Sequence, residues 1–148
     1  MLLRTGSNNH VRHIVALIVV AAGILAVTGC AQSSSKPAEL SPVSKTDDFH
    51  REVLQASQPA LVDFSTMWCP ACQQLKPKLE KLAGEYSRKA RFFHVDLDKS
   101  PELKRQYDIV AYPTVILFSN GKEVNRWVNE HSMDVYKAAI DQAAVGQR

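Results

Sequence analysis

Two cysteines, Cys69 and Cys72, are separated only by the dipeptide Pro-Ala. They follow a short apolar run at residues 60–65 and open a helical pattern at about residues 69–86. In a helix, this spacing places both sulfurs one turn apart on one face, close enough for a disulfide. A helix N-terminus has unpaired amides and a partial positive charge, which stabilise a thiolate. The pattern therefore predicts a redox dithiol, with Cys69, nearer the helix end, as nucleophile and Cys72 as resolving cysteine.

Other uses of a close cysteine pair remain open at this point. A zinc site normally needs four ligands, but there is no second cysteine pair, and His50, His94 and His131 are scattered along the sequence. A purely structural disulfide across so short a loop would restrain little of the unfolded chain. A copper-handling thiol pair is also possible, with Met67 as a soft ligand.

The elements that position the pair alternate between helix and strand. The expected order is helix 46–57, strand 60–65, helix 69–86, strand 91–97, helix 101–107, strand 114–119, strand 123–128 and a final helix after Ser132. Thr46 is expected to cap the first helix, and Pro77 to kink the long one. Parallel units followed by a hairpin predict an α/β fold, with a mixed sheet and helices on both faces.

The N-terminus has the pattern of a targeting segment. Arg4 and Arg12 precede an apolar run at residues 14–27, which is shorter than the ~20 residues that span a membrane. The run ends in Leu-Ala-Val-Thr-Gly-Cys at residues 25–30, which resembles the bacterial lipobox. This resemblance implies cleavage before Cys30, a diacylglycerol on its sulfur, and a fatty acyl group such as palmitate on its amino group. The alternative is an ordinary cleavable signal peptide.

We therefore divide the chain into a signal peptide (1–29), a lipidated N-terminus with a flexible linker (30–45), and one globular domain (46–148). The linker is rich in Ser and Pro and has no apolar periodicity. The 148 residues carry 18 Lys and Arg against 15 Asp and Glu, a net charge of +3. Two of those basic residues and none of the acidic ones lie in the signal, so the rest carries +1. With no basic block, we expect no nucleic-acid partner.

Residues from about 46 to 144 resemble thioredoxin. The resemblance rests on Val62-Asp63-Phe64, Trp68 directly before the cysteine pair, Pro77, Tyr112-Pro113-Thr114 and Asn120-Gly121, in that order. It implies a thioredoxin-like fold and a protein-disulfide oxidoreductase that needs no cofactor or metal beyond its own cysteines.

Asp63 resembles the buried acid of that family, which exchanges a proton with the resolving cysteine through water. An acid inside the apolar run 61–64 would be desolvated, which favours its protonated form. From the sequence alone, Asp63 could equally be a solvated carboxylate at a strand end.

The resemblance also implies a substrate-binding surface. Pro113 resembles the family's cis-proline, which lets the preceding backbone bind an extended substrate chain. Trp68 resembles the aromatic residue beside the site, and Pro70 and Tyr112 are expected on the same surface. The alternatives are a trans proline that starts a strand and a tryptophan packed in the core.

The sequence departs from the family pattern at several positions. Pro-Ala replaces the usual Gly-Pro between the cysteines, which leaves the direction of electron flow open. His94 stands where a lysine near the buried acid is common, Asn129 where a glycine is usual, and Tyr112 where a small or aliphatic residue is usual.

The functional hypothesis is a membrane-tethered thiol–disulfide oxidoreductase outside the bacterial cytoplasm, facing the periplasm or the exterior. It would reduce or isomerise protein disulfides and draw electrons from a membrane thiol carrier. The alternative is a copper-handling or assembly-factor lipoprotein that uses the same cysteine pair for binding.

Overall fold

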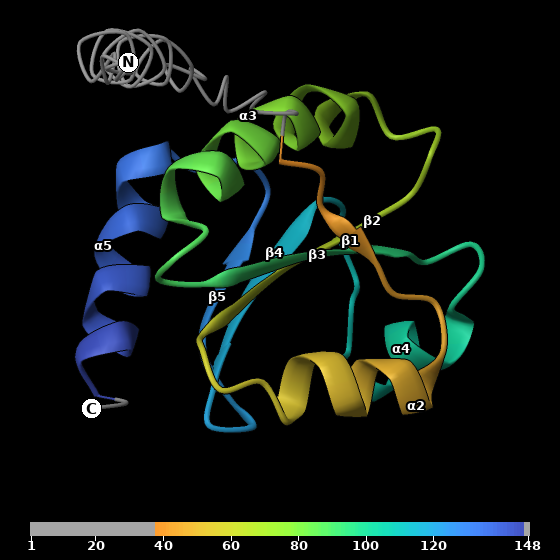
Figure 1. Ribbon diagram of the computed structural model, residues 1–148. Coiled ribbons are helices and arrows are strands. Elements are labelled where there is room, and N and C mark those ends of the chain that lie inside the picture. The colour runs from red at the N-terminus through yellow and green to blue at the C-terminus, as the bar shows by residue number, and fades with distance from the viewer. Residues whose placement is uncertain (1–37, 147–148) are drawn as a thin grey trace, which may run out of the picture. The chain divides into compact units, whose positions relative to one another are not determined.

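A computed structural model describes residues 38–146. The chain forms a five-stranded sheet with helices on both faces (Figure 1). The strands are β1 (Ser41–Pro42), β2 (Ala60–Ser65), β3 (Arg91–Asp96), β4 (Thr114–Ser119) and β5 (Lys122–Val128). The helices are α2 (Thr46–Phe49), the π-helical turn η1 (His50–Leu54), α3 (Pro70–Tyr86), α4 (Pro101–Gln106) and α5 (Met133–Val145).

The sheet is mixed, as the sequence predicts. Its order is β1-β3-β2-β4-β5, with β1 and β2 parallel to β3, and β4 antiparallel to both β2 and β5. β2 is the central strand, and all six of its residues are buried. Asn120 and Gly121 make the hairpin turn before β5, with φ angles of 51° and 74°, a backbone conformation that Asn and Gly adopt most easily.

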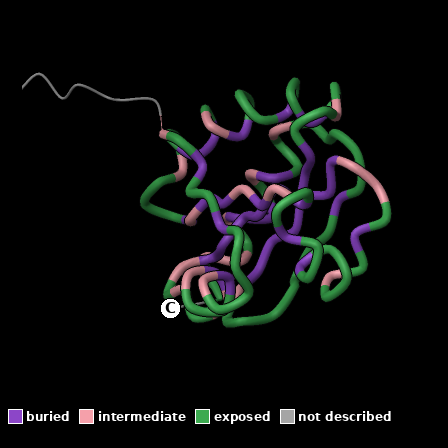
Figure 2. The backbone as a smooth tube through the Cα atoms, turned by 90° about the vertical axis from the view of Figure 1, so that its right-hand side faces the viewer, coloured by how far each residue is buried: buried purple, intermediate pink, exposed green. Residues whose placement is uncertain are grey.

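Two apolar clusters fill the two faces of the sheet. α3 and α5 cover one face, whereas α2, η1 and α4 cover the other (Figure 1). The predicted apolar face of α3, namely Leu75, Leu79, Leu82 and Ala83, is buried. In Figure 2 the buried stretches run through the middle of the molecule, between exposed outer segments. The cysteine pair therefore belongs to a helix that is held along its length by the core.

The end of the predicted linker is part of the fold. Residues 41–42 form β1 beside β3, and Leu40 and Val43 are only 3% and 4% exposed. Leu40 packs in the cluster under α3 and Val43 in the cluster on the other face. The Ser- and Pro-rich composition hides these two apolar anchors, whose partners lie about fifty residues further along the chain.

The helix starts differ in detail from the sequence prediction. Lys45, not Thr46, is the N-cap of α2, and the predicted first helix is a short α2 followed by η1. α3 begins at Pro70, with Cys69 as its N-cap, and it continues through Pro77.

The predicted signal segment and the lipobox cysteine Cys30 lie outside the described residues. Within residues 38–146, none of the helices has the length and apolar character needed to cross a bilayer.

The burial of Leu40 makes the start of the domain testable. We expect Leu40→Ala to lower the free energy of unfolding by ~2–4 kcal/mol, because it removes buried methyl groups and leaves a cavity. Urea unfolding would measure this change. Glu39→Ala is the control, because Glu39 is the neighbouring residue and is exposed. Equal stability of the Leu40→Ala and Glu39→Ala proteins would show that the domain begins later than Leu40.

Candidate active site

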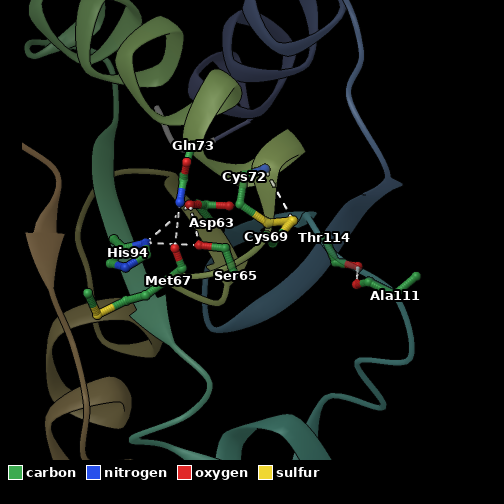
Figure 3. Close-up of a disulfide and its surroundings, with 9 residues drawn as sticks. All are labelled: Asp63, Ser65, Met67, Cys69, Cys72, Gln73, His94, Ala111 and Thr114. Atoms are coloured by element: carbon green, nitrogen blue, oxygen red, sulfur yellow. Dashed lines mark hydrogen bonds and ion pairs between the residues drawn. A yellow bond between two sulfur atoms is a disulfide. The ribbon is translucent and has the colours of Figure 1, made fainter.

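The cysteine pair lies at the first turn of α3. Cys69 and Cys72 form a disulfide, with their Cα atoms 5.3 Å apart (Figure 3). Cys69 Sγ accepts a hydrogen bond from the backbone N–H of Cys72 at 3.2 Å. Cys69 is partly exposed, whereas Cys72 is only 3% exposed. A thiolate on Cys69 would therefore accept the Cys72 amide hydrogen bond at the positive end of the helix dipole, within reach of another molecule.

The loop between β2 and α3 is held at both ends. The backbone N–H of Cys69 donates to Thr66 O at 3.5 Å, and that of Gln73 donates to Cys69 O at 3.1 Å. The side chain of Gln73 donates from Nε2 to Met67 O at 2.7 Å. Pro70 occupies the first helical turn, where no amide donor is needed. These bonds fix Cys69 relative to the end of the central strand.

Asp63 on β2 is buried, with 1% of its surface exposed. Its Oδ2 lies 3.0 Å from Ser65 Oγ, which donates to it, and 3.1 Å from His94 Nδ1. Its Oδ1 is also buried and has no hydrogen-bond partner among residues 38–146. The structure thus excludes the solvated strand-end carboxylate and supports the buried acid that the sequence resemblance implies.

The strand register brings His94 to the acid. Asp63 and His94 are paired residues of the parallel strands β2 and β3, so their side chains stand next to each other on one face of the sheet. The His94 side chain is 20% exposed. It lines a pocket of about 200 Å³ together with Cys72, Ser65 and Lys76. In Figure 3 the Asp63 carboxyl lies between His94 and Cys72.

The loop before β4 forms another wall of the site. The peptide bond between Tyr112 and Pro113 is cis, as the resemblance implies. Thr114 Oγ1 donates to Ala111 O at 2.8 Å, and the Asn129 N–H donates to Pro113 O at 2.8 Å. Asn129 has a φ of 67°, a left-handed conformation that favours glycine but that asparagine tolerates. This explains how Asn129 can stand where the family usually has a glycine.

Several large apolar side chains near the cysteines in the chain or in the loop before β4 are exposed. Trp68 is 71% exposed and Met67 is 68% exposed, so Trp68 is not the core residue that the sequence left possible. Val110, in the loop before Pro113, is 89% exposed. Tyr112 is half-buried, with the ammonium of Lys104 5.1 Å from its ring centre. Trp68 and Met67 are neighbours in the chain, so together they offer exposed apolar area directly before Cys69.

The structure does not assemble a metal site around the pair. Among residues 38–146, no three His, Cys, Asp or Glu side chains are grouped closely enough to hold a metal ion. The Met67 thioether, the suggested soft copper ligand, points away from the disulfide (Figure 3).

Sequence reasoning missed two side chains of this site. Ser65, the partner of Asp63, could have been found, because residues two apart on a strand point to the same face. Gln73, which binds the Met67 carbonyl, had no signal in the sequence beyond its place in the first turn of the helix.

The site combines a cysteine pair at a helix start, a buried carboxyl and a loop with a cis-proline. On a five-stranded mixed sheet, this combination defines a dithiol protein with the thioredoxin fold. Comparison with known proteins agrees: residues 41–142 match the thioredoxin family model. The chain is 38% identical over 77 residues to the thioredoxin of Griffithsia pacifica, which covers 52% of this chain and 71% of that protein. It is 39% identical over 80 residues to the bifunctional thioredoxin reductase/thioredoxin of Mycobacterium leprae, covering 54% of this chain but only 18% of that longer protein.

A solved structure supports the same assignment. The thioredoxin of Malassezia sympodialis superposes with a TM-score of 0.65 at 27% identity, covering 72% of this chain and 92% of that one. The chain belongs to the thioredoxin family. It is a thiol–disulfide oxidoreductase whose redox group is its own Cys69–Cys72 pair, so it needs no bound cofactor.

The unequal exposure of the two sulfurs predicts unequal reactivity. In the reduced protein, we expect iodoacetamide to modify Cys69 first, because Cys69 is accessible and stabilised as a thiolate whereas Cys72 is buried. Mass spectrometry of peptides after short exposure would measure this. In Cys69→Ser, the remaining Cys72 should react at least about tenfold more slowly than Cys69 does in Cys72→Ala. Equal rates in these two variants would contradict the assignment.

Proposed function

We propose that this protein is a membrane-tethered oxidoreductase outside the cytoplasm that reduces, or isomerises, disulfides of other proteins. The observation that carries the chemistry is the partly exposed Cys69 Sγ at the N-terminus of α3, with the buried Cys72 one turn further on. The proposal of reduction draws on Trp68 and Asp63, which are thioredoxin-like, and on the absence of a histidine between the cysteines.

The first step assigned to this site is attack by the Cys69 thiolate on a substrate disulfide. One substrate sulfur bonds to Cys69 Sγ, and the other leaves with the electron pair and takes a proton. In the second step, Cys72 Sγ bonds to Cys69 Sγ and its proton passes to Asp63. The second substrate sulfur leaves as a thiolate and is protonated by solvent. The substrate gains two electrons, and the cysteine pair returns to a disulfide.

The substrate would bind as an extended segment on the apolar surface beside the pair. Trp68 and Pro70 are exposed at the start of α3, and Tyr112 directly precedes the cis-proline. Pro113 is itself buried, so its role would be to shape the loop and present the backbone of its neighbours. Such a surface accepts many sequences, because apolar contact and backbone hydrogen bonds do not select one side-chain pattern.

Disulfide reduction tests the mechanism directly. We expect the reduced protein to reduce insulin, and Cys69→Ser to lose more than about 99% of this activity because the nucleophile is gone. Cys72→Ala should attack but not resolve, so it should accumulate mixed disulfides that identify the substrates. Cys30→Ser serves as the matched control and should retain activity. Full activity in Cys69→Ser would eliminate the proposed chemistry.

The tether proposal rests on the sequence around Cys30. The described domain begins at Ala38, so seven residues (31–37) separate it from Cys30. Fully extended, they would span at most about 25 Å. A lipid on Cys30 would therefore keep the domain near the membrane surface, and several acyl chains would hold it there stably. In that location the electron donor would be a membrane thiol carrier.

Lipidation can be tested in a bacterial host. We expect the protein to incorporate labelled palmitate and to fractionate with membranes, and Cys30→Ser to lose both properties because Cys30 is the cysteine that ends the lipobox-like segment. Cys69→Ser should keep its label and its membrane association. Equal labelling of the Cys30→Ser and unsubstituted proteins would contradict the anchor.

A further inference from the structure

His94 is the more exposed of the two residues whose side chains bind Asp63. Asp63 and Ser65 are 1% and 2% exposed, whereas the His94 side chain is 20% exposed. Ser65 Oγ also lies 3.3 Å from His94 Nδ1, so the three polar groups form one compact cluster. The His94 imidazole therefore contacts the buried acid and also lines the solvent-facing pocket beside Cys72.

The two carboxyl oxygens of Asp63 have different contacts. Ser65 Oγ and His94 Nδ1 both approach Oδ2, while Oδ1 has no hydrogen-bond partner among the described residues. An ionised carboxylate can only accept hydrogen bonds, so beside it Nδ1 of His94 must carry a proton and donate. Two donors on one oxygen fix the carboxyl plane and leave the other oxygen available to receive a proton.

We propose that His94 is a positioning residue for the reaction. It holds Oδ2 of Asp63 so that Oδ1 takes the Cys72 proton. This inference rests on the proposed role of Asp63 as the base for Cys72.

The step that His94 would assist is resolution of the mixed disulfide. The proton of the Cys72 thiol passes to Oδ1, and Cys72 Sγ forms a bond to Cys69 Sγ. The bond between Cys69 Sγ and the substrate sulfur breaks, and its electron pair leaves with the substrate. Attack by Cys69 on the first disulfide does not require Asp63, so His94 should affect only the second step.

The other groups around this cluster come from each neighbouring element. α3 contributes Cys72 and Lys76 to the same pocket, and β1 places Pro42, which cannot titrate, opposite His94. From α5, Tyr136 is neutral in the working range, because burial, with a smaller contribution from the Asp63 charge, raises its pKa to about 12. Imidazole is the side chain whose ordinary titration falls between pH 5 and 8. A histidine here gives the second step a pH dependence that an amide would not.

Three variants separate positioning from general damage. His94→Leu removes the donor, His94→Asn keeps an N–H close to the position of Nδ1 but cannot titrate, and His50→Leu is a control at an exposed histidine on η1. Each is made in the full chain. Stopped-flow measurement with a peptide disulfide gives the resolution rate, and the same substitutions in a Cys72→Ala background give the rate of attack by Cys69.

We expect His94→Leu to slow resolution about tenfold near neutral pH, as for loss of a hydrogen bond to a charged group, and to change the attack rate less than about twofold. His94→Asn should recover resolution to within about threefold of the unsubstituted rate and flatten its pH profile between about pH 5.5 and 8. His50→Leu should change neither rate.

Three results would overturn the inference: equal slowing of both steps in His94→Leu, an unchanged resolution rate in that variant, or coincident pH profiles of His94→Asn and the unsubstituted protein. If His94→Leu does not fold, the pH profile of His94→Asn decides the question. Absence of any disulfide reduction by the unsubstituted protein would instead overturn the proposed function, independently of His94.

Discussion

The junction between β2 and α3 is the constraint on which the rest of the structure depends. β2 is buried on both faces, between β3 and β4, and the helix that starts after it is packed along its length on the core. Because both elements are fixed, the short loop between them has little freedom, and its hydrogen bonds hold Cys69 at the helix end. The reactivity expected of the Cys69 sulfur thus depends on the burial of β2, which fixes the loop that leads to Cys69.

The sequence was most informative where the signal is local. The apolar run of β2, the periodicity of α3 and the spacing of Cys69 and Cys72 are properties of neighbouring residues, and the structure agrees with each of them to within one residue. The contact between Asp63 and His94 depends instead on the register of two strands joined through a whole helix. No local pattern specifies such a register, and for the same reason β1 was hidden in a stretch whose composition resembles a linker.

The departures from the family pattern have different structural consequences. Asn129 keeps the left-handed backbone that a glycine would adopt there, so the geometry beside Pro113 is retained while a side chain is added. His94 instead adds a ring with two nitrogens, one of which lies against an otherwise enclosed acid. The backbone geometry is thus retained at the first position, whereas at the second an imidazole stands beside the buried acid.

The packing of the first described residues also decides how the domain would bear mechanical load. Ala38 lies against Gly84 in the last part of α3, and Leu40 is buried just before β1. A force applied to the chain at residue 38 would act on this edge of the sheet and on the end of α3 opposite the cysteines. A pull on the N-terminal segment would therefore act first on β1 and on the last part of α3, away from the Cys69 end of that helix, and would reach the site through the pairing of Pro42 with His94.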